Sequence, residues 1–236
     1  MSVQVHQLTK IYGEQTAVNA ISFSAEPGQV LGFLGPNGAG KSTTMKILTC
    51  FVPQTSGSAR VAGYDVVDSP LDARRQVGYL PEHNPLYLDL YVRESLGFIA
   101  NIHQVPNKKE RIEQVIELTG LTSERSKKVG ALSKGFRQRL GLAQAIIHDP
   151  KVLILDEPTS GLDPNQVLGV RNLIRELGKT KTVIFSTHIM QEVEAVCDQV
   201  IIINKGNIVV DESLAQLTGR NAGRTLEEIF IELTNN

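Results

Sequence analysis

The sequence has no tryptophan and only two cysteines, and neither sign of charge predominates. Cys50 and Cys197 lie far apart and fit no metal-binding or redox spacing, so we expect two reduced, buried thiols. The formal net charge of −1 gives no general attraction for nucleic acid or for an anionic membrane. No apolar run approaches the ~20 residues that span a bilayer, and no signal-peptide pattern opens the chain. These absences predict a cytoplasmic chain that reaches a membrane only through a partner.

A glycine-rich segment matches the phosphate-loop pattern G-x-x-x-x-G-K-[ST]: Gly35-Pro36-Asn37-Gly38-Ala39-Gly40-Lys41-Ser42. Residues 29–34 before it predict a buried strand, and residues 42–50 after it predict a helix. A strand that turns through glycines into a helix points backbone N–H groups and a helix N-terminus into one small space, which favours phosphate. We expect Lys41 to reach the terminal phosphates and Ser42 to ligate Mg²⁺. The residues expected to contact the nucleotide are Gly35, Pro36, Asn37, Gly38, Ala39, Gly40, Lys41, Ser42 and Thr43.

A second apolar run, residues 151–156, ends in two carboxylates, Asp156 and Glu157. A continuous aliphatic strand is typical of a parallel sheet that is covered on both faces. Its carboxyl end can bring Asp156 beside the phosphate loop, where the carboxylate holds Mg²⁺ directly or through water. Glu157 then faces the γ-phosphate and can orient or deprotonate an attacking water. The alternative is a strand that merely ends in acids, and the phosphate loop elsewhere in the chain argues against it.

The remaining pattern predicts an α/β core with a helical insertion. Strands are expected near residues 3–8, 17–23, 58–61, 77–80, 182–186, 199–204 and 207–210, the first two as an antiparallel start. Helical periodicity replaces this alternation between about 84 and 131. Tyr12 lies at a strand end, where its ring either stacks on a purine or packs internally. Glu82 follows the strand over 77–80, at the sheet edge where open α/β sheets bind ligands.

Three further motifs follow in order along the chain. Leu132-Ser133-Lys134-Gly135-Phe136-Arg137-Gln138-Arg139 opens a helix after the insertion, Ser160-Gly161-Leu162-Asp163 follows the acidic pair, and Thr187-His188 follows a strand. With the phosphate loop and Tyr12, they resemble the nucleotide-binding subunit of ATP-binding-cassette (ABC) transporters over essentially the whole chain. The first of these motifs, residues 132–139, is similar to the family's signature motif, and we call it the signature segment. Its Ser133-Lys134-Gly135-Phe136 variant is similar to those of export-type and drug-resistance-type subunits. The tail 226–230 and the Leu-Pro-Glu loop resemble subunits associated with gliding motility.

The resemblance implies a P-loop NTPase fold of the α/β class, with a mixed core sheet and an N-terminal antiparallel β-subdomain. It implies one ABC ATPase domain, with a core of residues 1–83 and 132–220, a helical subdomain of 84–131 and a C-terminal helix over 221–236. This helix is acidic, so we expect it to dock on the protein rather than on a membrane surface. The implied cofactors are ATP and Mg²⁺.

The resemblance also implies a head-to-tail dimer, which all the motifs in one chain allow to be a homodimer. Ser133 and Gly135 of one copy would close over the γ-phosphate bound at Lys41 of the other. His188 would contact that phosphate and hold the attacking water, and Tyr12 would stack on adenine. The metal ligands would be Ser42, Asp156 and Glu82. Glu82 replaces the family's usual glutamine, and its added negative charge could raise the pKa of a neighbouring carboxylate.

We therefore predict an ATPase subunit that drives a separate membrane permease from the inner face of the membrane. The permease would dock near Glu82 and the insertion over 84–131. Two alternatives are a soluble ABC-type ATPase acting on ribosomes or nucleic acid, and a nucleotide switch without a transport role. The balanced charge and the single cassette argue against a nucleic-acid partner. The sequence does not specify the cargo or its direction.

Overall fold

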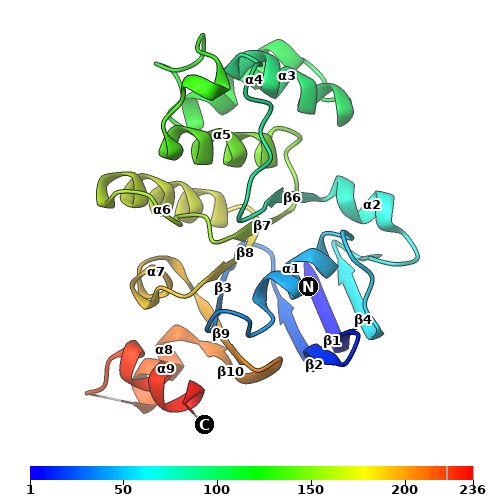
Figure 1. Ribbon diagram of the computed structural model, residues 1–236, viewed down its shortest axis with the longest axis vertical. Coiled ribbons are helices and arrows are strands. Elements are labelled where there is room, and N and C mark those ends of the chain that lie inside the picture. The colour runs from blue at the N-terminus through cyan, green and yellow to red at the C-terminus, as the bar shows by residue number, and fades with distance from the viewer. Residues whose placement is uncertain (222, 236) are drawn as a thin grey trace.

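The structure is a computed structural model that describes residues 1–221 and 223–235. Figure 1 shows a central sheet with α3, α4 and α5 at one end of the molecule and a second sheet and the C-terminal helices at the other. The elements in chain order are β1 Val3–Tyr12, β2 Gln15–Ala25, β3 Val30–Leu34, α1 Lys41–Leu48, β4 Ser56–Val61, β5 Tyr64–Asp65, α2 Pro70–Arg75, β6 Val77–Leu80, α3 Val92–Ile102, α4 Lys108–Leu118, a 3₁₀ turn Val129–Ala131, α5 Lys134–Ile146, β7 Val152–Asp156, α6 Pro164–Gly178, β8 Thr182–Thr187, α7 Met190–Val196, β9 Gln199–Asn204, β10 Asn207–Ser213, α8 Leu214–Arg220 and α9 Leu226–Thr234.

The central sheet has the strand order β10-β9-β3-β8-β7-β6. Its strands run parallel except for β10, which pairs antiparallel with β9. Every residue of β3, β7 and β8 is buried, because helices or the second sheet cover both faces. Leu153 and Leu155 face the core shared with α5 and α6, whereas Val152 and Ile154 face the core shared with α1. The expected mixed core sheet is confirmed.

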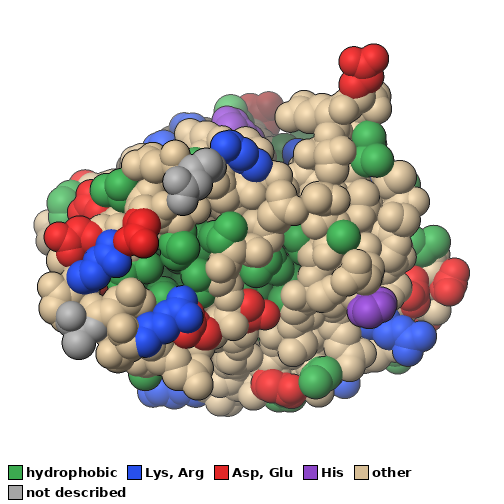
Figure 2. Space-filling model, turned by 90° about the horizontal axis from the view of Figure 1, so that it is seen from below, with side chains coloured by type: hydrophobic (Ala, Val, Ile, Leu, Met, Phe, Trp, Pro, Cys, Tyr) green, Lys and Arg blue, Asp and Glu red, His purple; other side chains and the backbone are tan. Residues whose placement is uncertain are grey.

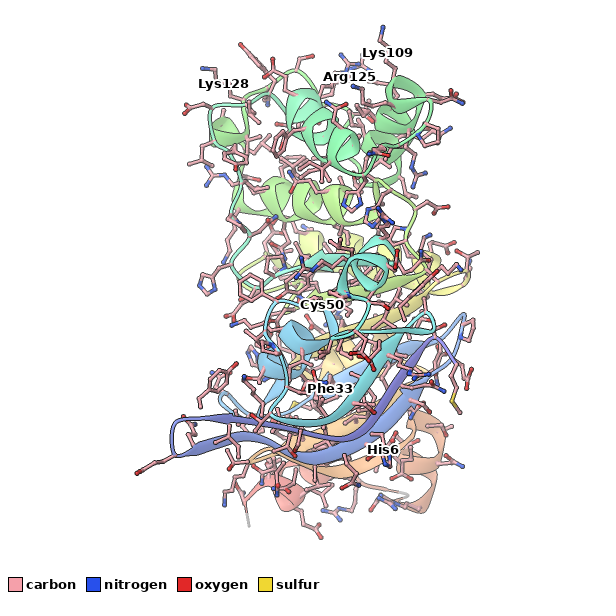
Figure 3. All side chains as sticks on the ribbon, turned by 90° about the vertical axis from the view of Figure 1, so that its right-hand side faces the viewer. His6, Phe33, Cys50, Lys109, Arg125 and Lys128 are labelled. Carbon is pink, nitrogen blue, oxygen red and sulfur yellow. The ribbon has the colours of Figure 1, made fainter. Side chains whose placement is uncertain are left out.

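The second sheet is antiparallel, with the order β2-β1-β4-β5. It packs on the central sheet through a core that includes Phe23 and Phe33, whose ring centroids lie 5.5 Å apart. Figure 3 shows Phe33 between the two sheets, while His6 lies out on the antiparallel sheet. The first two strands are longer than predicted, since their pairing extends through residues that are polar and exposed. This sheet places the end of β1 beside the phosphate loop.

The helical layer consists of α3 and α4 packed on α5. Helices α3 and α4 lie in the segment 84–131 where helical periodicity predicts them, and the first turn of α3 is held by a hydrogen bond from Tyr91 N to Glu94 Oε2 of 2.9 Å. The apolar faces of the three helices join α6 and one face of the sheet in a single core. The outer surface of the helical layer carries basic side chains. Figure 3 shows Lys109, Arg125 and Lys128 at this end of the molecule. Within the described residues, no helix combines the length and the apolar character needed to cross a bilayer.

The C-terminal helix α9 docks on the protein, as expected. Leu226, Ile229 and Phe230 are buried against α7, α8, β9 and β10. Thr225 caps the helix, and the Glu228 carboxylate accepts a hydrogen bond from the Thr225 N–H at 2.8 Å. Figure 2 views this end of the molecule and shows hydrophobic side chains surrounded by acidic and basic ones. The helix predicted over 221–236 is shorter in the structure, where α9 begins at Leu226 and ends at Thr234. The prediction for residues 222 and 236 lies outside the described residues.

The two cysteines are free thiols, as expected, but neither is fully buried. Cys197 lies beneath Gly32 of β3, where an added Cβ would come within 2.6 Å of its sulfur. Burial raises the pKa of Cys197 well above its usual value and also raises the pKa of Cys50. Both thiols therefore stay protonated at neutral pH and have no arrangement suited to redox chemistry.

Candidate functional site

The phosphate loop leads from β3 into α1 by a backbone path that requires glycine. Gly38 and Gly40 have φ of +79° and +112°, a region that L side chains rarely adopt. At Gly35, an added Cβ would lie 2.5 Å from the carbonyl oxygen of Ile203 in β9, so the loop lies tightly on the sheet. The helix α1 begins at Lys41, one residue earlier than predicted. The free N–H groups of its first turn therefore open directly onto the loop.

The side chain of Lys41 is held inside the loop and is only 6% exposed. Its Nζ donates to the carbonyl oxygens of Gly35 at 2.7 Å and Pro36 at 3.2 Å. The same Nζ lies 3.7 Å from Oε1 of Glu157. Burial lowers the pKa of Lys41, and the charges of Glu157 and Asp156 oppose this shift. The ammonium is thus a positive charge placed among backbone oxygens and carboxylates, beside the helix N-terminus.

Asp156 ends β7 and connects it to the phosphate loop. It is 2% exposed, and its Oδ1 accepts a hydrogen bond from Ser42 Oγ at 3.1 Å. Ser186 of β8 donates a second hydrogen bond to the same oxygen. Among the residues that the structure describes, no group of three or more His, Cys, Asp or Glu side chains forms a metal-binding cluster. A cation here would need ligands beyond the protein, in addition to Ser42 and Asp156.

Glu157 adopts an unusual backbone conformation at the end of the same strand, with φ of +50°. Its N–H donates to Ser186, to the carbonyl oxygen at 3.2 Å and to Oγ at 3.1 Å. Its carboxylate faces His188, whose Nδ1 lies 3.0 Å from Oε2. Burial raises the pKa of Glu157, with a smaller contribution from Asp156, while His188 and Lys41 oppose the shift. A carboxylate with a raised pKa is better suited to accept a proton from water.

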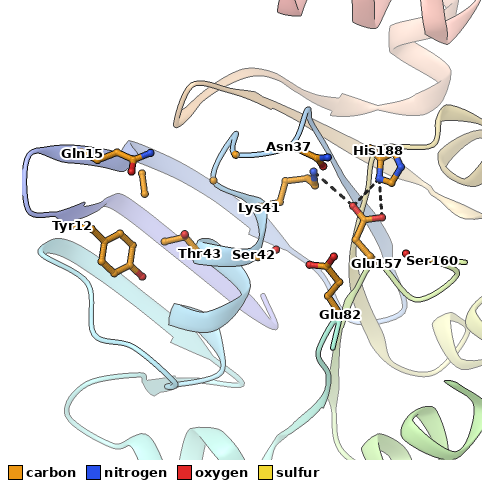
Figure 4. A pocket seen from close by; sticks show the side chains of 13 residues that line it. Tyr12, Gln15, Asn37, Lys41, Ser42, Thr43, Glu82, Glu157, Ser160 and His188 are labelled. Atoms are coloured by element: carbon orange, nitrogen blue, oxygen red, sulfur yellow. Dashed lines mark hydrogen bonds and ion pairs between the residues drawn. The ribbon is translucent and has the colours of Figure 1, made fainter. Parts of the chain in front are cut away.

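Lys41, Glu157 and His188 face a cavity of about 580 Å³, shown in Figure 4. Its lining is Tyr12, Gln15, Ala17, Asn37, Gly38, Gly40, Lys41, Ser42, Thr43, Glu82, Glu157, Ser160 and His188. Most of the predicted nucleotide-binding residues are therefore together. Gly35, Pro36 and Ala39 belong to the loop but are not in the lining. Gln15 and Ala17 were not predicted, because nothing in their residue type signals a ligand and only the β1–β2 hairpin brings them to the loop.

Tyr12 lies at the end of β1 on the rim of this cavity and is 45% exposed. The Nζ of Lys10 lies 4.9 Å from the centroid of its ring, over the ring face. The ring does not pack internally, so the alternative of an internal packing role is wrong. An exposed aromatic ring at the mouth of a phosphate site is suited to stack on a base.

Glu82 lies between the main cavity and a second hollow of about 440 Å³. The second hollow is lined by Ser42, Lys46, Phe51, Tyr79, Pro81, Glu82, His83, Pro85 and Asp156. The acidic neighbour that raises the pKa of Glu157 is Asp156, so our expectation that Glu82 has this effect is not met there. The charge of Glu82 instead adds to the raised pKa of Tyr79, which is due mainly to burial.

Ser133 and Gly135 lie at the start of α5 and, among the described residues, are absent from the lining of the main cavity. Ser133 is exposed and caps the helix, since its Oγ accepts from Phe136 N at 3.3 Å. Gly135 packs so closely on Gln166 of α6 that an added Cβ would lie 2.0 Å from its Oε1. Asp163 caps α6 by accepting from Gln166 N at 3.0 Å. The start of α5 therefore does not contribute to the cavity that the phosphate loop of the same chain lines, as far as the described residues show.

A strand, a glycine-rich phosphate loop and a helix, with an acidic pair at the end of a neighbouring parallel strand, define a P-loop nucleoside triphosphatase. The family described as "ABC transporter" matches residues 18–160, more than half of the chain. The chain belongs to this family. It is an ATP-binding and ATP-hydrolysing subunit of the ABC transporter class.

Two similar proteins are named as ATP-binding proteins. The chain is 35% identical over 236 residues to the linearmycin resistance ATP-binding protein LnrL of Bacillus subtilis, covering 99% of this chain and 76% of that protein. It is 38% identical over 221 residues to the bacitracin transport ATP-binding protein BcrA of Bacillus licheniformis, covering 93% and 72%. These names do not bear on gliding motility, so that subgroup assignment stays a prediction.

Solved structures agree on the fold. An ATP-binding subunit of an ABC transporter superimposes with a TM-score of 0.89 at 28% identity, covering 99% of both chains. An ATP-binding cassette solved as a dimer with ADP and Pi superimposes with a TM-score of 0.82 at 23% identity, covering 90% of this chain and 98% of that one. The second likeness establishes the fold alone. The predicted ABC ATPase fold is confirmed.

Proposed function

We propose that this chain hydrolyses ATP with Mg²⁺ and drives a separate membrane permease through ATP-dependent dimerisation. The observation that carries the proposal is the convergence of Lys41, Glu157 and His188 on one cavity that the phosphate loop also lines. A cation, a hydrogen-bond acceptor for water and an imidazole are the groups that phosphoryl transfer to water requires.

In the proposed reaction, a water oxygen attacks the γ-phosphorus and the bond from that phosphorus to the β–γ bridging oxygen breaks, giving ADP and phosphate. Glu157 orients the water and accepts its proton, which its raised pKa favours. Lys41 and the backbone N–H groups of the loop stabilise the negative charge that develops on the phosphoryl oxygens. His188 holds the Glu157 carboxylate in place and contacts the γ-phosphate.

The donor set suits Mg²⁺. The hydroxyl of Ser42 and the carboxylate of Asp156 are oxygen ligands that already lie within 3.1 Å of each other. Mg²⁺ is typically held by one or two carboxylates with waters and substrate phosphates, so it suits a site where the described part of the chain forms no larger cluster of acidic, His or Cys side chains. Glu82, exposed at the edge of the same cavity, is the third proposed ligand. The ion supplies charge neutralisation on the β- and γ-phosphates.

The position of the signature segment supports the proposed dimer. Ser133 is exposed at the N-terminus of α5, with free N–H groups and the positive end of a helix dipole beside it. We propose that it binds the γ-phosphate held at Lys41 of a second copy, so each triphosphate joins two subunits. ATP then favours the closed pair, and hydrolysis releases it.

The permease would dock near Glu82 and the helical insertion, and would hold the chain at the inner face of the membrane. We propose the division expected from the sequence, with a core of 1–83 and 132–220, a helical part of 84–131 and a C-terminal segment of 221–236 that contains α9. The relatives named for linearmycin resistance and bacitracin transport support an export-type transporter. Co-purification of the chain with a multi-span membrane protein tests this part of the proposal; purification without one from detergent-solubilised membranes would contradict it.

The site assignment is tested with two substitutions and matched controls. Lys41→Ala is expected to abolish ATP binding or turnover, whereas Lys109→Ala, on the exposed face of α4, is expected to leave both unchanged. Glu157→Gln is expected to bind ATP and accumulate as a dimer, whereas Glu227→Gln on α9 is expected to behave like the unmodified chain. Turnover is measured as phosphate release and dimerisation by size-exclusion chromatography with ATP. An unaltered rate for Lys41→Ala, or normal turnover by Glu157→Gln, would contradict the assignment.

A further inference from the structure

A buried carboxylate, Glu192, joins the two chain segments that carry the catalytic side chains. Glu192 is 2% exposed and lies in the first turn of α7, outside the lining of the main cavity. Its Oε1 accepts a hydrogen bond from Thr159 Oγ1, and its Oε2 accepts one from Thr187 Oγ1 at 2.7 Å. Thr159 follows Glu157 by two residues, and Thr187 immediately precedes His188. One side chain therefore links the ends of the neighbouring strands β7 and β8.

The network fixes the backbone on both sides of His188. Besides donating to Glu192, the Thr187 hydroxyl accepts a hydrogen bond from Ile189 N at 3.1 Å. The Thr187 hydroxyl oxygen therefore links the residue before the histidine to the backbone of the residue after it. This arrangement restricts the directions in which the imidazole can point.

The network also supports the strained conformation of Glu157. A residue other than glycine with a φ of +50° is uncommon and persists only when its surroundings hold it. Hydrogen bonds to Ser186 hold its own N–H, and the Thr159–Glu192 bond holds the chain two residues further on. A buried carboxylate is costly unless it is hydrogen-bonded, and here two hydroxyls meet that need from the segments that bear the catalytic pair.

We infer that Glu192 is a positioning residue for ATP hydrolysis. By holding Thr159 and Thr187, it keeps the Glu157 carboxylate 3.0 Å from His188 Nδ1 and directs both into the cavity (Figure 4). The inference rests on the proposed roles of Glu157 and His188. Loss of one of the two hydroxyls lowers kcat about tenfold to a hundredfold, as displacements near 1 Å do. The KM for ATP stays unchanged, because neither threonine belongs to the phosphate loop.

The test uses pairs of variants that separate the hydrogen bond from the packing. Thr159→Val keeps the shape of the side chain but removes the hydroxyl, whereas Thr159→Ser keeps the hydroxyl and removes the methyl group. The same pair is made at Thr187. Thr119→Val is the matched control. Thr119 is also buried, but it directly follows α4, and its hydroxyl donates back to Val115 O of that helix at 2.7 Å. For each variant, kcat and KM for ATP hydrolysis and the midpoint of urea unfolding are measured.

A low kcat with an unchanged KM in the valine variants, restored in the serine variants, supports the inference. A role in packing alone gives the opposite order, with serine worse than valine, and overturns it. A kcat for Thr159→Val and Thr187→Val equal to that of the control also overturns it. The unmodified chain and Glu157→Gln are assayed alongside. Normal turnover by Glu157→Gln contradicts the proposed site itself, whereas an inactive Glu157→Gln beside fully active valine variants overturns only the role of Glu192.

Discussion

His188 Nδ1 lies 3.0 Å from Oε2 of Glu157, so the imidazole donates to the carboxylate that is proposed to accept the proton of water. The two groups come from the ends of adjacent parallel strands, β7 and β8. Burial raises the pKa of Glu157, and this hydrogen bond is the largest influence in the opposite direction. The histidine therefore helps to keep the base ionised as well as correctly oriented.

We predict that removal of this hydrogen bond changes the pH dependence of hydrolysis. Turnover needs the carboxylate form of Glu157, so kcat falls as the pH decreases through the raised pKa of that group. In His188→Ala the opposing influence is lost, the pKa of Glu157 rises further, and the acid limb of the pH–rate profile moves to higher pH. Turnover at neutral pH is expected to fall about 10²-fold to 10⁴-fold, which is typical for a lost acid–base group or its partner.

His6→Ala is the matched control for this prediction, because His6 is exposed on the antiparallel sheet. Its profile is expected to coincide with that of the unmodified chain. An acid limb at the same pH in His188→Ala and in the control would show that His188 does not set the ionisation of Glu157.

We predict that substitution of Tyr12 changes the affinity for the nucleotide. Its ring is exposed on the rim of the cavity, with Lys10 over one face. If the ring stacks on adenine, Tyr12→Ala weakens ATP binding by the ~0.5–1.5 kcal/mol of an aromatic pair, a loss of a few-fold to about tenfold. Tyr12→Phe keeps the ring and is expected to bind as the unmodified chain does. Isothermal titration with ATP measures both, and equal affinities for Ala and Phe would exclude stacking.

The phosphate loop and the acidic strand were predictable because their signals are local. A loop between residues 35 and 42 must be rich in glycine to follow its backbone path, and a strand buried on both faces must be apolar throughout. The caps of α6 and α9 are local in the same sense, since each is formed by residues three positions apart. The chemistry of the site therefore followed from short stretches of sequence.

Contacts between distant segments were not predictable in this way. Gln15 and Ala17 line the cavity only because the β1–β2 hairpin reaches the loop. Nothing near Gly135 in the sequence shows that Gln166 excludes a side chain there. The buried Glu192 looks like an ordinary first-turn acid of a helix, and only the structure places it between two threonines. The division of the chain at residues 84 and 131 also remains a prediction.

We predict that substitution of Glu82 changes the Mg²⁺ concentration that hydrolysis requires. The exposed carboxylate of Glu82 lines the second hollow together with Ser42 and Asp156, which form the proposed metal site. Glu82→Gln keeps a ligand oxygen but removes a charge, so the Mg²⁺ concentration for half-maximal hydrolysis is expected to rise up to about fivefold, the scale of an exposed ion pair. The maximal rate is expected to be retained. Glu94→Gln, on α3, is the control, and an identical Mg²⁺ dependence for both variants would remove Glu82 from the metal site.

We predict that substitution of Gly78, in the strand that precedes Glu82, lowers the stability of the fold. A Cβ added at Gly78 would lie 2.1 Å from the carbonyl oxygen of Ala145 in α5, so this helix rests directly on the backbone of β6. Gly78→Ala must push strand and helix apart, and overpacking of this kind lowers the free energy of unfolding by ~1–3 kcal/mol. Gly219→Ala is the control, because Gly219 lies in α8 and, apart from its chain neighbours and its own helix backbone, no atom of the described residues lies within 4 Å of an added Cβ. That substitution is expected to raise stability by ~0.5–1 kcal/mol, since alanine is the better helix former. Urea unfolding followed by circular dichroism measures both, and equal stabilities would mean that α5 can move off β6 without cost.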